Sequence, residues 1–254
     1  MRRPAITATA TVWGVAVVVG MLVAGQQHAG PVDRTLTEQV HAAVGNGAGL
    51  AAFLLVPTDT DVIAAAIAVV IAVALVRRRW DVLVLAAVTP TFCVAITELV
   101  LKPLFGRRLD GQFSYPSGHA VAAVAVYTVA LLAFAAGTSA LRRRLAAAGW
   151  FAMVVTVMAG LIGMNCHYPT DTVGGVCVAL GVVLPGALVA DTVCRRPGAR
   201  IPRPRAGSAL RPPLAADLDE SVARRSPGTP AAPRTAANPP PSSTEAAARV
   251  GRAP

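Results

Sequence analysis

Three short polar stretches stand out in an otherwise apolar sequence because their side chains could carry out chemistry. They are Lys102–Arg108, Tyr115–His119 and His167–Asp171. Together they supply cations, a serine next to a glycine, two histidines and a carboxylate. Phosphoryl transfer needs fixed cations and N–H donors, because negative charge builds up on the oxygens around phosphorus. We therefore interpret the three stretches as parts of one phosphate site.

The first stretch supplies the cations Lys102, Arg107 and Arg108. Arginine binds phosphate through a bidentate fork, whereas lysine acts as a point charge. Lys102 is the only lysine in the chain, against 22 arginines, so a generally basic composition does not explain it. Glu98 precedes Lys102 by four residues, a spacing typical of an ion pair on one helix face; a role in tuning Lys102 stays open. We expect the three cations to bind phosphate.

The second stretch, Pro116–His119, opens an apolar run. Ser117 is a good helix N-cap, and the exposed N–H groups at the start of a helix bind anions. Gly118 allows the backbone to approach a phosphate closely. His119 then lies in the first turn, beside the same anion, so this helix start is predicted to hold the phosphate.

In the third stretch, His167 and Asp171 lie four residues apart around Pro169, which the first turn of a helix tolerates. The spacing allows Asp171 to hold one imidazole nitrogen while the other attacks. A histidine oriented by a carboxylate follows the logic of a catalytic triad, here with histidine as the nucleophile. The plainer reading of Asp171 is an acidic residue that favours the helix dipole. His28 and His41 lack such a context, and we interpret them as ordinary packed or interfacial residues.

Membrane helices must position these stretches. The chain is 54% hydrophobic and 14% charged, whereas soluble domains carry about 25% charged residues. A helix needs about 20 residues to cross the bilayer core. The sequence therefore predicts an all-α fold of six transmembrane helices, with a short surface helix between the first two. Its apolar runs lie at about 5–25, 61–76, 81–101, 118–137, 145–165 and 171–193.

The apolar run at the N-terminus has a second interpretation, because a signal peptide cut after Ala24 would look similar. We favour an uncleaved helix, since further apolar runs follow it. The four cysteines form no C-x-x-C pair or other metal-ligand spacing. We therefore predict neither a disulfide framework nor a metal site.

Arginine clusters predict the orientation of the helices. The positive-inside rule puts such clusters, and with them both termini, in the cytoplasm. The loops at 102–117 and 166–170 then lie on the extracytoplasmic face of the cell membrane. The clusters are Arg2–Arg3, Arg77–Arg79, Arg142–Arg144 and Arg195–Arg196.

Residues 196–254 are predicted to be a disordered tail, separate from a membrane domain at residues 1–195. From Arg195 onward the chain holds 12 of its 20 prolines, with 11 arginines against four acidic side chains. Such a composition cannot bury enough apolar surface to fold. Its arginines either contact anionic lipid headgroups or are simply solvated. No basic face with interleaved aromatics is present, so we exclude a nucleic-acid partner; the oligomeric state stays open.

The three stretches resemble the motifs of the type 2 phosphatidic acid phosphatase (PAP2) family, which includes lipid phosphatases and vanadium-dependent haloperoxidases. That family's pattern is K-x6-R-P, P-S-G-H and S-R-x5-H-x3-D. Pro116–His119 matches the second motif fully, and His167 and Asp171 match the end of the third. The resemblance covers roughly residues 60–193 and implies the family's helical core.

The resemblance also implies a role for each matching residue. His167 would form a phosphohistidine intermediate, and Asp171 would orient it. His119 would protonate the leaving oxygen and then activate water. The residues implied to hold the phosphate are Lys102, Ser117 and Gly118.

Two motifs depart from the family pattern. In the first, Leu109 and Asp110 stand where the family has arginine and proline, so Arg107 or Arg108 must substitute; we favour Arg107. In the third, the Ser-Arg pair falls at Gly160-Leu161, so a phosphate-binding arginine is missing. Arg108 is one replacement for it. We interpret the chain as a divergent active member, because both histidines, the aspartate and the lysine remain.

The function expected from this resemblance is hydrolysis of a lipid phosphomonoester or diphosphate, without a metal or other cofactor. The lipid tail would stay in the bilayer while the headgroup enters the site. Polyprenyl diphosphate, phosphatidate and phosphatidylglycerophosphate are equal candidates. The alternative is a non-catalytic lipid-phosphate binding or transport protein, for which the missing arginine would be the signature. A haloperoxidase is a weaker third reading, since those enzymes are soluble.

Overall fold

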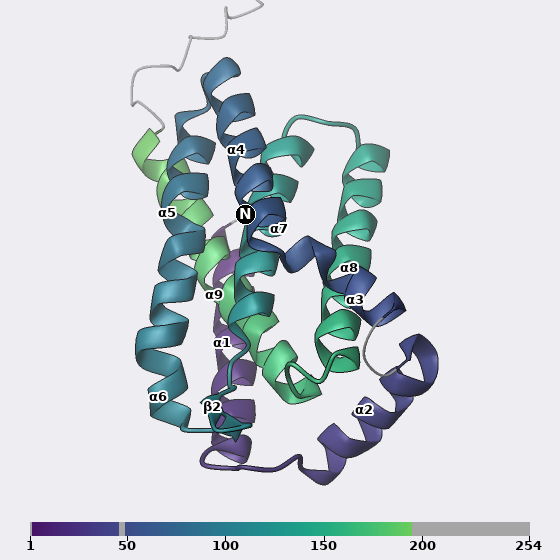
Figure 1. The fold of residues 1–254 in the computed structure, drawn as a ribbon. Helices are drawn as coiled ribbons and strands as arrows, with labels where there is room; N and C mark the ends of the chain where they lie inside the picture. The colour runs from purple at the N-terminus through teal and green to yellow at the C-terminus, as the bar shows by residue number, and fades with distance from the viewer. Residues whose placement is uncertain (1, 46–48, 195–254) are drawn as a thin grey trace, which may run out of the picture. The chain divides into compact units, whose positions relative to one another are not determined.

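Helices make up nearly all of the regular structure in the computed structural model, which describes residues 2–45 and 49–194 (Figure 1). Within these ranges a short antiparallel hairpin pairs Arg108 with Phe113 and Leu109 with Gln112. The elements are α1 (Arg2–Val23), α2 (Pro31–Val44), α3 (Leu50–Leu55), η1 (Val56–Thr58), α4 (Thr60–Val76), α5 (Trp80–Ile96), the π-helical turn η2 (Thr97–Leu101), α6 (Lys102–Phe105), β1 (Arg108–Leu109), β2 (Gln112–Phe113), α7 (Gly118–Ala135), α8 (Ala140–Gly163) and α9 (Pro169–Cys194).

The predicted bundle of membrane-spanning helices is confirmed. In the described part of the chain, five helical segments are long and apolar enough to cross a membrane, and a bent pair makes a sixth. Large apolar side chains cover their outer faces: Met21 is 70% exposed, Leu99 76% and Val76 84%. Exposed apolar side chains of this kind suit helices that are surrounded by lipid. The backbone of such a helix needs no water, because its polar groups are hydrogen-bonded within the helix. The chain is a membrane protein.

The second predicted span is the bent one. Leu50–Thr58 and Thr60–Val76 meet at an angle of 41°. The break falls at Asp59, whose backbone is extended (φ −60°, ψ 138°). The polar stretch before it forms the expected short helix, α2, which begins with Pro31 and ends before Gly45. Residues before the second apolar run therefore fold back against the bundle.

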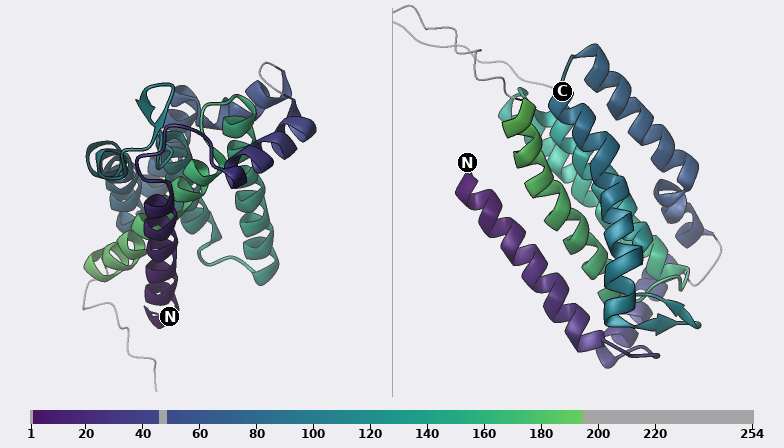
Figure 2. Two further views of the ribbon diagram at one scale, coloured as in Figure 1. Left: turned by 90° about the horizontal axis from the view of Figure 1, so that it is seen from below. Right: turned by 90° about the vertical axis from the view of Figure 1, so that its left-hand side faces the viewer.

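Helix α9 lies at the centre and packs against α1, α5 and α7 (Figures 1 and 2). Glycines in α9 allow α1 and α7 to approach it closely. A Cβ atom on Gly181 would lie 2.6 Å from the Trp13 ring nitrogen, and one on Gly175 would lie 2.8 Å from the Ser117 carbonyl oxygen. Trp13 in turn donates a hydrogen bond of 3.0 Å to the Gly181 carbonyl. The start of α7 is thereby held directly against α9.

The loops that carry the chemical residues lie at one end of the helices. The α6–α7 hairpin, the α8–α9 connection and α2 gather there, whereas the α4–α5 and α7–α8 connections lie at the opposite end (Figure 1). Arg77–Arg79 and Arg142–Arg144 belong to that opposite end. The predicted tail at 196–254 and the cluster Arg195–Arg196 fall outside the described residues.

Candidate active site

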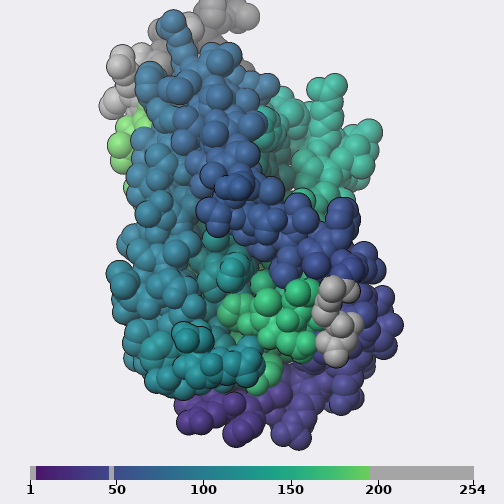
Figure 3. All heavy atoms as spheres, viewed as in Figure 1, coloured from purple at the N-terminus to yellow at the C-terminus, as the bar shows by residue number. Residues whose placement is uncertain are grey.

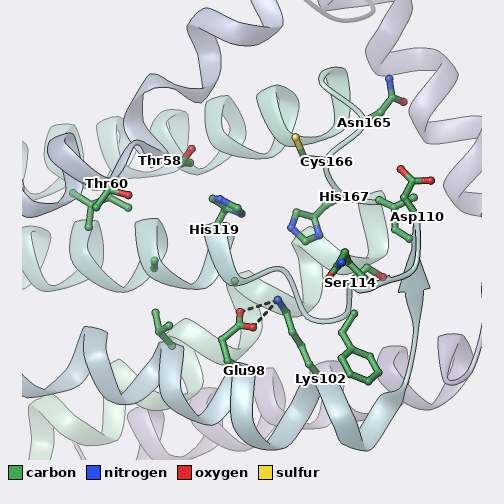
Figure 4. A pocket seen from close by; sticks show the side chains of 17 residues that line it. Thr58, Thr60, Glu98, Lys102, Asp110, Ser114, His119, Asn165, Cys166 and His167 are labelled. Carbon is green, nitrogen blue, oxygen red and sulfur yellow. Dashed lines mark hydrogen bonds and ion pairs between the residues drawn. The ribbon is translucent and has the colours of Figure 1, made fainter.

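A cavity of about 730 Å³ brings together residues from all three chemical stretches. Glu98, Lys102, Gly118, His119 and His167 lie along its wall (Figure 4). In the space-filling view, the green α8–α9 connection reaches the surface between the teal hairpin and the blue α3–α4 segment (Figure 3). Stretches that are well separated in the sequence thus meet at one end of the bundle.

The two histidines lie next to each other on the wall of this cavity. His119 comes from the first turn of α7, and His167 lies shortly before the start of α9. Their ring centroids are 5.9 Å apart, with the ring planes at 60°. Reacting atoms approach to about 3–3.5 Å before bond formation. The two imidazoles are therefore close enough for both to contact one phosphoryl group bound beside them in the cavity.

The Asp171 carboxylate lies on the far side of His167. Its Oδ2 is 3.8 Å from His167 Nδ1, which is an ion-pair distance rather than a hydrogen bond. The same oxygen accepts a 3.2 Å hydrogen bond from the Tyr168 N–H. His167 Nδ1 is buried and has no hydrogen-bond partner among the described residues. Catalytic hydrogen bonds are often long before substrate binds, so this geometry suits the predicted pair.

Lys102 reaches the cavity as half of an ion pair. Its Nζ lies 2.8 Å from Glu98, the partner that the four-residue spacing predicted. A Cβ atom on Gly118 would lie 2.5 Å from the Glu98 carboxylate and 3.7 Å from Lys102 Nζ. The glycine therefore lets the α7 backbone come close to the ammonium. The π-helical turn η2, a feature frequent at functional sites, carries Glu98.

The start of α7 offers backbone donors. The Ser117 hydroxyl accepts from the Ala120 N–H at 3.3 Å and so caps the helix. The Ser117 N–H donates to the Asp171 carbonyl at 3.0 Å. Ser117 is fully buried, and its side chain does not line the cavity. In the first helical turn, the N–H groups of Gly118 and His119 have no acceptor within the helix, which leaves them for a phosphate.

Neither arginine predicted to bind phosphate lines the cavity. Arg107 is fully buried, and its Nη1 donates to Asp171 at 2.6 Å while its Nη2 donates to Asp33 at 2.5 Å. Its guanidinium also stacks on the Tyr168 ring at 4.4 Å. Arg108 is exposed and donates to the Gly111 carbonyl at 2.9 Å. Of the three predicted cations, Lys102 is therefore the one that lines the cavity.

Asp33 was not singled out from the sequence, yet it is 2% exposed and contacts the site. Its carboxylate accepts from the Thr170 N–H at 3.0 Å and from Arg107. The sequence offers one signal, an acidic residue shortly after Pro31 at a helix start. The helix dipole explains that pattern equally well, so only the burial reveals the contact.

The missing third-motif arginine has a structural explanation. Leu161 is 1% exposed and packs with Ala120, Ala123 and Val157. A Cβ atom on Gly160 would lie 2.9 Å from the backbone carbonyl carbon of Leu54 in α3. The place where the family has serine and arginine is therefore occupied by apolar packing, with α3 lying against α8.

Cys166 is a thiol on the cavity wall next to His167 and is a second candidate nucleophile. Partial desolvation raises the pKa of its thiol above the ordinary value. Because the thiolate is the reactive form, this shift disfavours Cys166 as a nucleophile. Burial likewise raises the pKa of the Tyr168 hydroxyl, which keeps that ring neutral over Arg107.

Residues 102–192 match the family model of the PAP2 superfamily. The matched segment begins at Lys102 and contains both histidines and Asp171. The resemblance expected from the three motifs is thereby confirmed. Comparison with curated proteins gave no match, and neither did comparison with solved structures.

Proposed function

We propose that the chain is a membrane phosphatase that hydrolyses a lipid phosphomonoester or diphosphate through a phosphohistidine at His167. The main support is that two histidines from separate parts of the chain lie next to each other on the wall of a cavity that Lys102 also lines. These groups are a nucleophile, a proton donor and a cation, which the reaction requires. The superfamily match supports the same chemistry.

The proposed mechanism has two steps. In the first, His167 attacks phosphorus, His119 protonates the leaving oxygen, and the lipid product departs. In the second, His119 accepts a proton from water, which attacks the phosphohistidine and releases phosphate. Asp171 stabilises the charged imidazole. Lys102 and the first N–H groups of α7 neutralise the phosphoryl oxygens, where such donors contribute most.

The lipid nature of the substrate is supported by the rest of the cavity wall. Ile63 from α4, Val94 from α5 and Ala122 from α7 line it beyond the histidines. An acyl or isoprenoid tail can remain among these helices while its phosphate reaches His167. Polyprenyl diphosphate, phosphatidate and phosphatidylglycerophosphate fit this description equally.

We further propose that the cavity opens on the extracytoplasmic side of the cell membrane. Support comes from Arg77–Arg79 and Arg142–Arg144, which lie at the opposite end of the helices. The test is a cysteine introduced at Gln112, an exposed position on β2, in a Cys166→Ser background that removes the exposed native thiol. It should react with membrane-impermeant reagents in intact cells. Reaction with permeant reagents alone would reverse the orientation.

The proposed activity is tested by phosphate release from purified protein in detergent with EDTA present. The panel contains the three candidate lipid classes, and His167→Ala is compared with wild type. His28→Ala serves as the control, because His28 is exposed and lies outside the cavity. Release by wild type and His28→Ala, but not by His167→Ala, is expected. No release across the panel from folded wild type would reject the phosphatase.

A non-catalytic lipid-phosphate binding or transport protein is the second candidate. Two observations favour it: Lys102 is paired with Glu98, and no arginine is among the described residues that line the cavity. His119→Ala separates the two functions. A binding protein keeps its lipid-phosphate affinity and cellular role in this variant, whereas a phosphatase loses turnover.

A further inference from the structure

Asp33 belongs to α2, far in sequence from the segment matched by the PAP2 model, but it lies in the same buried cluster as Asp171. We propose that Asp33 is a positioning residue for the reaction of His167. It acts through Arg107, Thr170 and Asp171 without contacting the substrate. The expected effect of Asp33 on turnover rests on the proposed function. Its expected effect on the alignment of Asp171 with His167 does not.

The contacts of Asp33 are specific. One carboxylate oxygen accepts from the Thr170 N–H at 3.0 Å and from the Thr170 hydroxyl at 2.9 Å. The other accepts from Arg107 Nη2 at 2.5 Å. Arg107 Nη1 in turn contacts the Thr170 hydroxyl at 2.5 Å and Asp171 Oδ1 at 2.6 Å. Asp33 thus binds the first turn of α9 directly and through a guanidinium.

Burial shows that these contacts are more than a helix-dipole effect. Asp33 is 2% exposed, and Arg107 and Asp171 are fully buried. An ionised group away from water is tolerated only when it is paired and hydrogen-bonded. Two carboxylates sharing one guanidinium satisfy that condition together. Removing the Asp33 charge leaves Asp171 as the sole carboxylate partner of Arg107 among the described residues.

The cluster fixes the orientation of the Asp171 carboxylate toward His167. Arg107 holds Asp171 Oδ1, and the Tyr168 N–H holds Oδ2, the oxygen nearest His167 Nδ1. The carboxylate plane is therefore fixed by bonds on both oxygens. If Asp33 no longer holds Arg107 and Thr170 in place, the α9 first turn loses its anchor and Asp171 misaligns with the imidazole. Small displacements of this kind can lower rates by about 10²-fold.

The kinetic test compares Asp33→Asn, Asp171→Asn and the double variant with wild type. Glu38→Gln is the matched control, because it removes a carboxylate from an exposed position of the same helix. Asp33→Asn is expected to lower kcat by roughly 10- to 100-fold with KM changed less than about threefold. The double variant should lose no more than Asp171→Asn alone. Losses that multiply, or a change in KM only, would overturn the inference.

A second readout does not depend on turnover. Acylation of histidines by diethylpyrocarbonate, followed by peptide mass spectrometry, reports the reactivity of His167 with His119 as the internal reference. Asp33→Asn should lower the His167 rate several-fold relative to His119. Equal ratios in wild type and variant would contradict the inference. If wild type releases no phosphate at all, the proposed function fails while this measurement still decides the role of Asp33.

Folding is monitored by size-exclusion profile and thermal unfolding in detergent. Should Asp33→Asn not fold, Asp33→Glu replaces it, because it keeps the charge and moves the carboxylate by one methylene. This variant is expected to fold and to lose kcat several-fold. A folded Asp33→Glu protein with wild-type kcat and wild-type His167 reactivity would show that the position of this carboxylate is unimportant.

Discussion

Two groups of charged residues sit side by side in this protein, one along the cavity and one in the interior. The cavity group reaches solvent: the Lys102 side chain is 14% exposed and that of its partner Glu98 43%. The interior group comprises Asp33, Arg107 and Asp171, which are at most 2% exposed and paired with one another. The cavity group is therefore accessible to a ligand, whereas the interior group is closed to one.

The difference is notable because Lys102 and Arg107 are close neighbours in the sequence. Between them, α6 ends at Phe105, and Gly106 follows with a φ of 61°, in the left-handed region that favours glycine. The chain turns there, and the two cations leave in different directions. Neighbouring basic residues therefore divide into one that lines the cavity and one that is buried with two carboxylates. Substitutions in each group can test whether the two groups have different roles.

The largest kinetic effect is expected at Asp171, the member of the interior group that lies against His167. Asp171→Asn keeps the shape of the side chain but removes the charge that stabilises the imidazolium. We expect kcat to fall by about 10²- to 10⁴-fold, as for triads that lose their carboxylate. Steady-state phosphate release measures it. A loss of kcat below threefold would show that Asp171 takes no part in the reaction and only belongs to the buried ion-pair cluster.

Arg107→Leu tests the interior group through the stability of the protein. It leaves the Asp33 and Asp171 carboxylates buried without a cation. Breaking a buried ion pair in this way costs about 3–5 kcal/mol, so thermal unfolding in detergent should occur at a markedly lower temperature. Arg108→Leu is the matched control, since Arg108 is exposed. Equal unfolding temperatures for the two variants would contradict the buried role of Arg107.

Lys102→Gln tests the cavity group by affinity. A hydrogen bond to a charged group contributes about 1.5–3 kcal/mol, so KM should rise by roughly 10- to 100-fold. The unfolding temperature should stay near that of wild type, because the pair with Glu98 is partly exposed and contributes little. The opposite pattern, lower stability with unchanged KM, would exchange the roles assigned to Lys102 and Arg107.

The smallest effect is expected from truncation at Arg196, which removes the predicted tail. Its composition, rich in proline, alanine and arginine, predicts a segment without a packed core of its own. Turnover per folded molecule should be unchanged. A folded truncated protein that has lost activity would give the tail a role in catalysis.

The sequence predicted the membrane helices well, because runs of about 20 apolar residues have few alternatives to spanning helices. It also predicted that Lys102, His119 and His167 lie together, since each stands at the same end of a predicted helix. It did not predict the burial of Arg107 or the contact of Asp33. Both depend on the packing of α2 against the start of α9, which lies far away in the sequence. A local sequence pattern does not predict a contact of this kind.

The sequence also did not predict that α3 packs against α8. Gly160 and Leu161 were interpreted as the loss of a phosphate-binding arginine, and this interpretation stays a prediction. The structure adds the reason that this position holds small and apolar residues: a Cβ atom on Gly160 would lie 2.9 Å from the Leu54 backbone. A short apolar segment before Pro57 gives no hint of its packing partner.

Detection of the covalent intermediate tests the role of His167 most directly. Wild-type protein is mixed with the most active lipid phosphate, quenched in alkaline denaturant within the first turnovers, and digested for mass spectrometry. We predict a phosphohistidine at His167 in the wild-type protein. Phosphate release without any phosphorylated histidine, or with the label on His119, would contradict the assignment of His167 as the nucleophile.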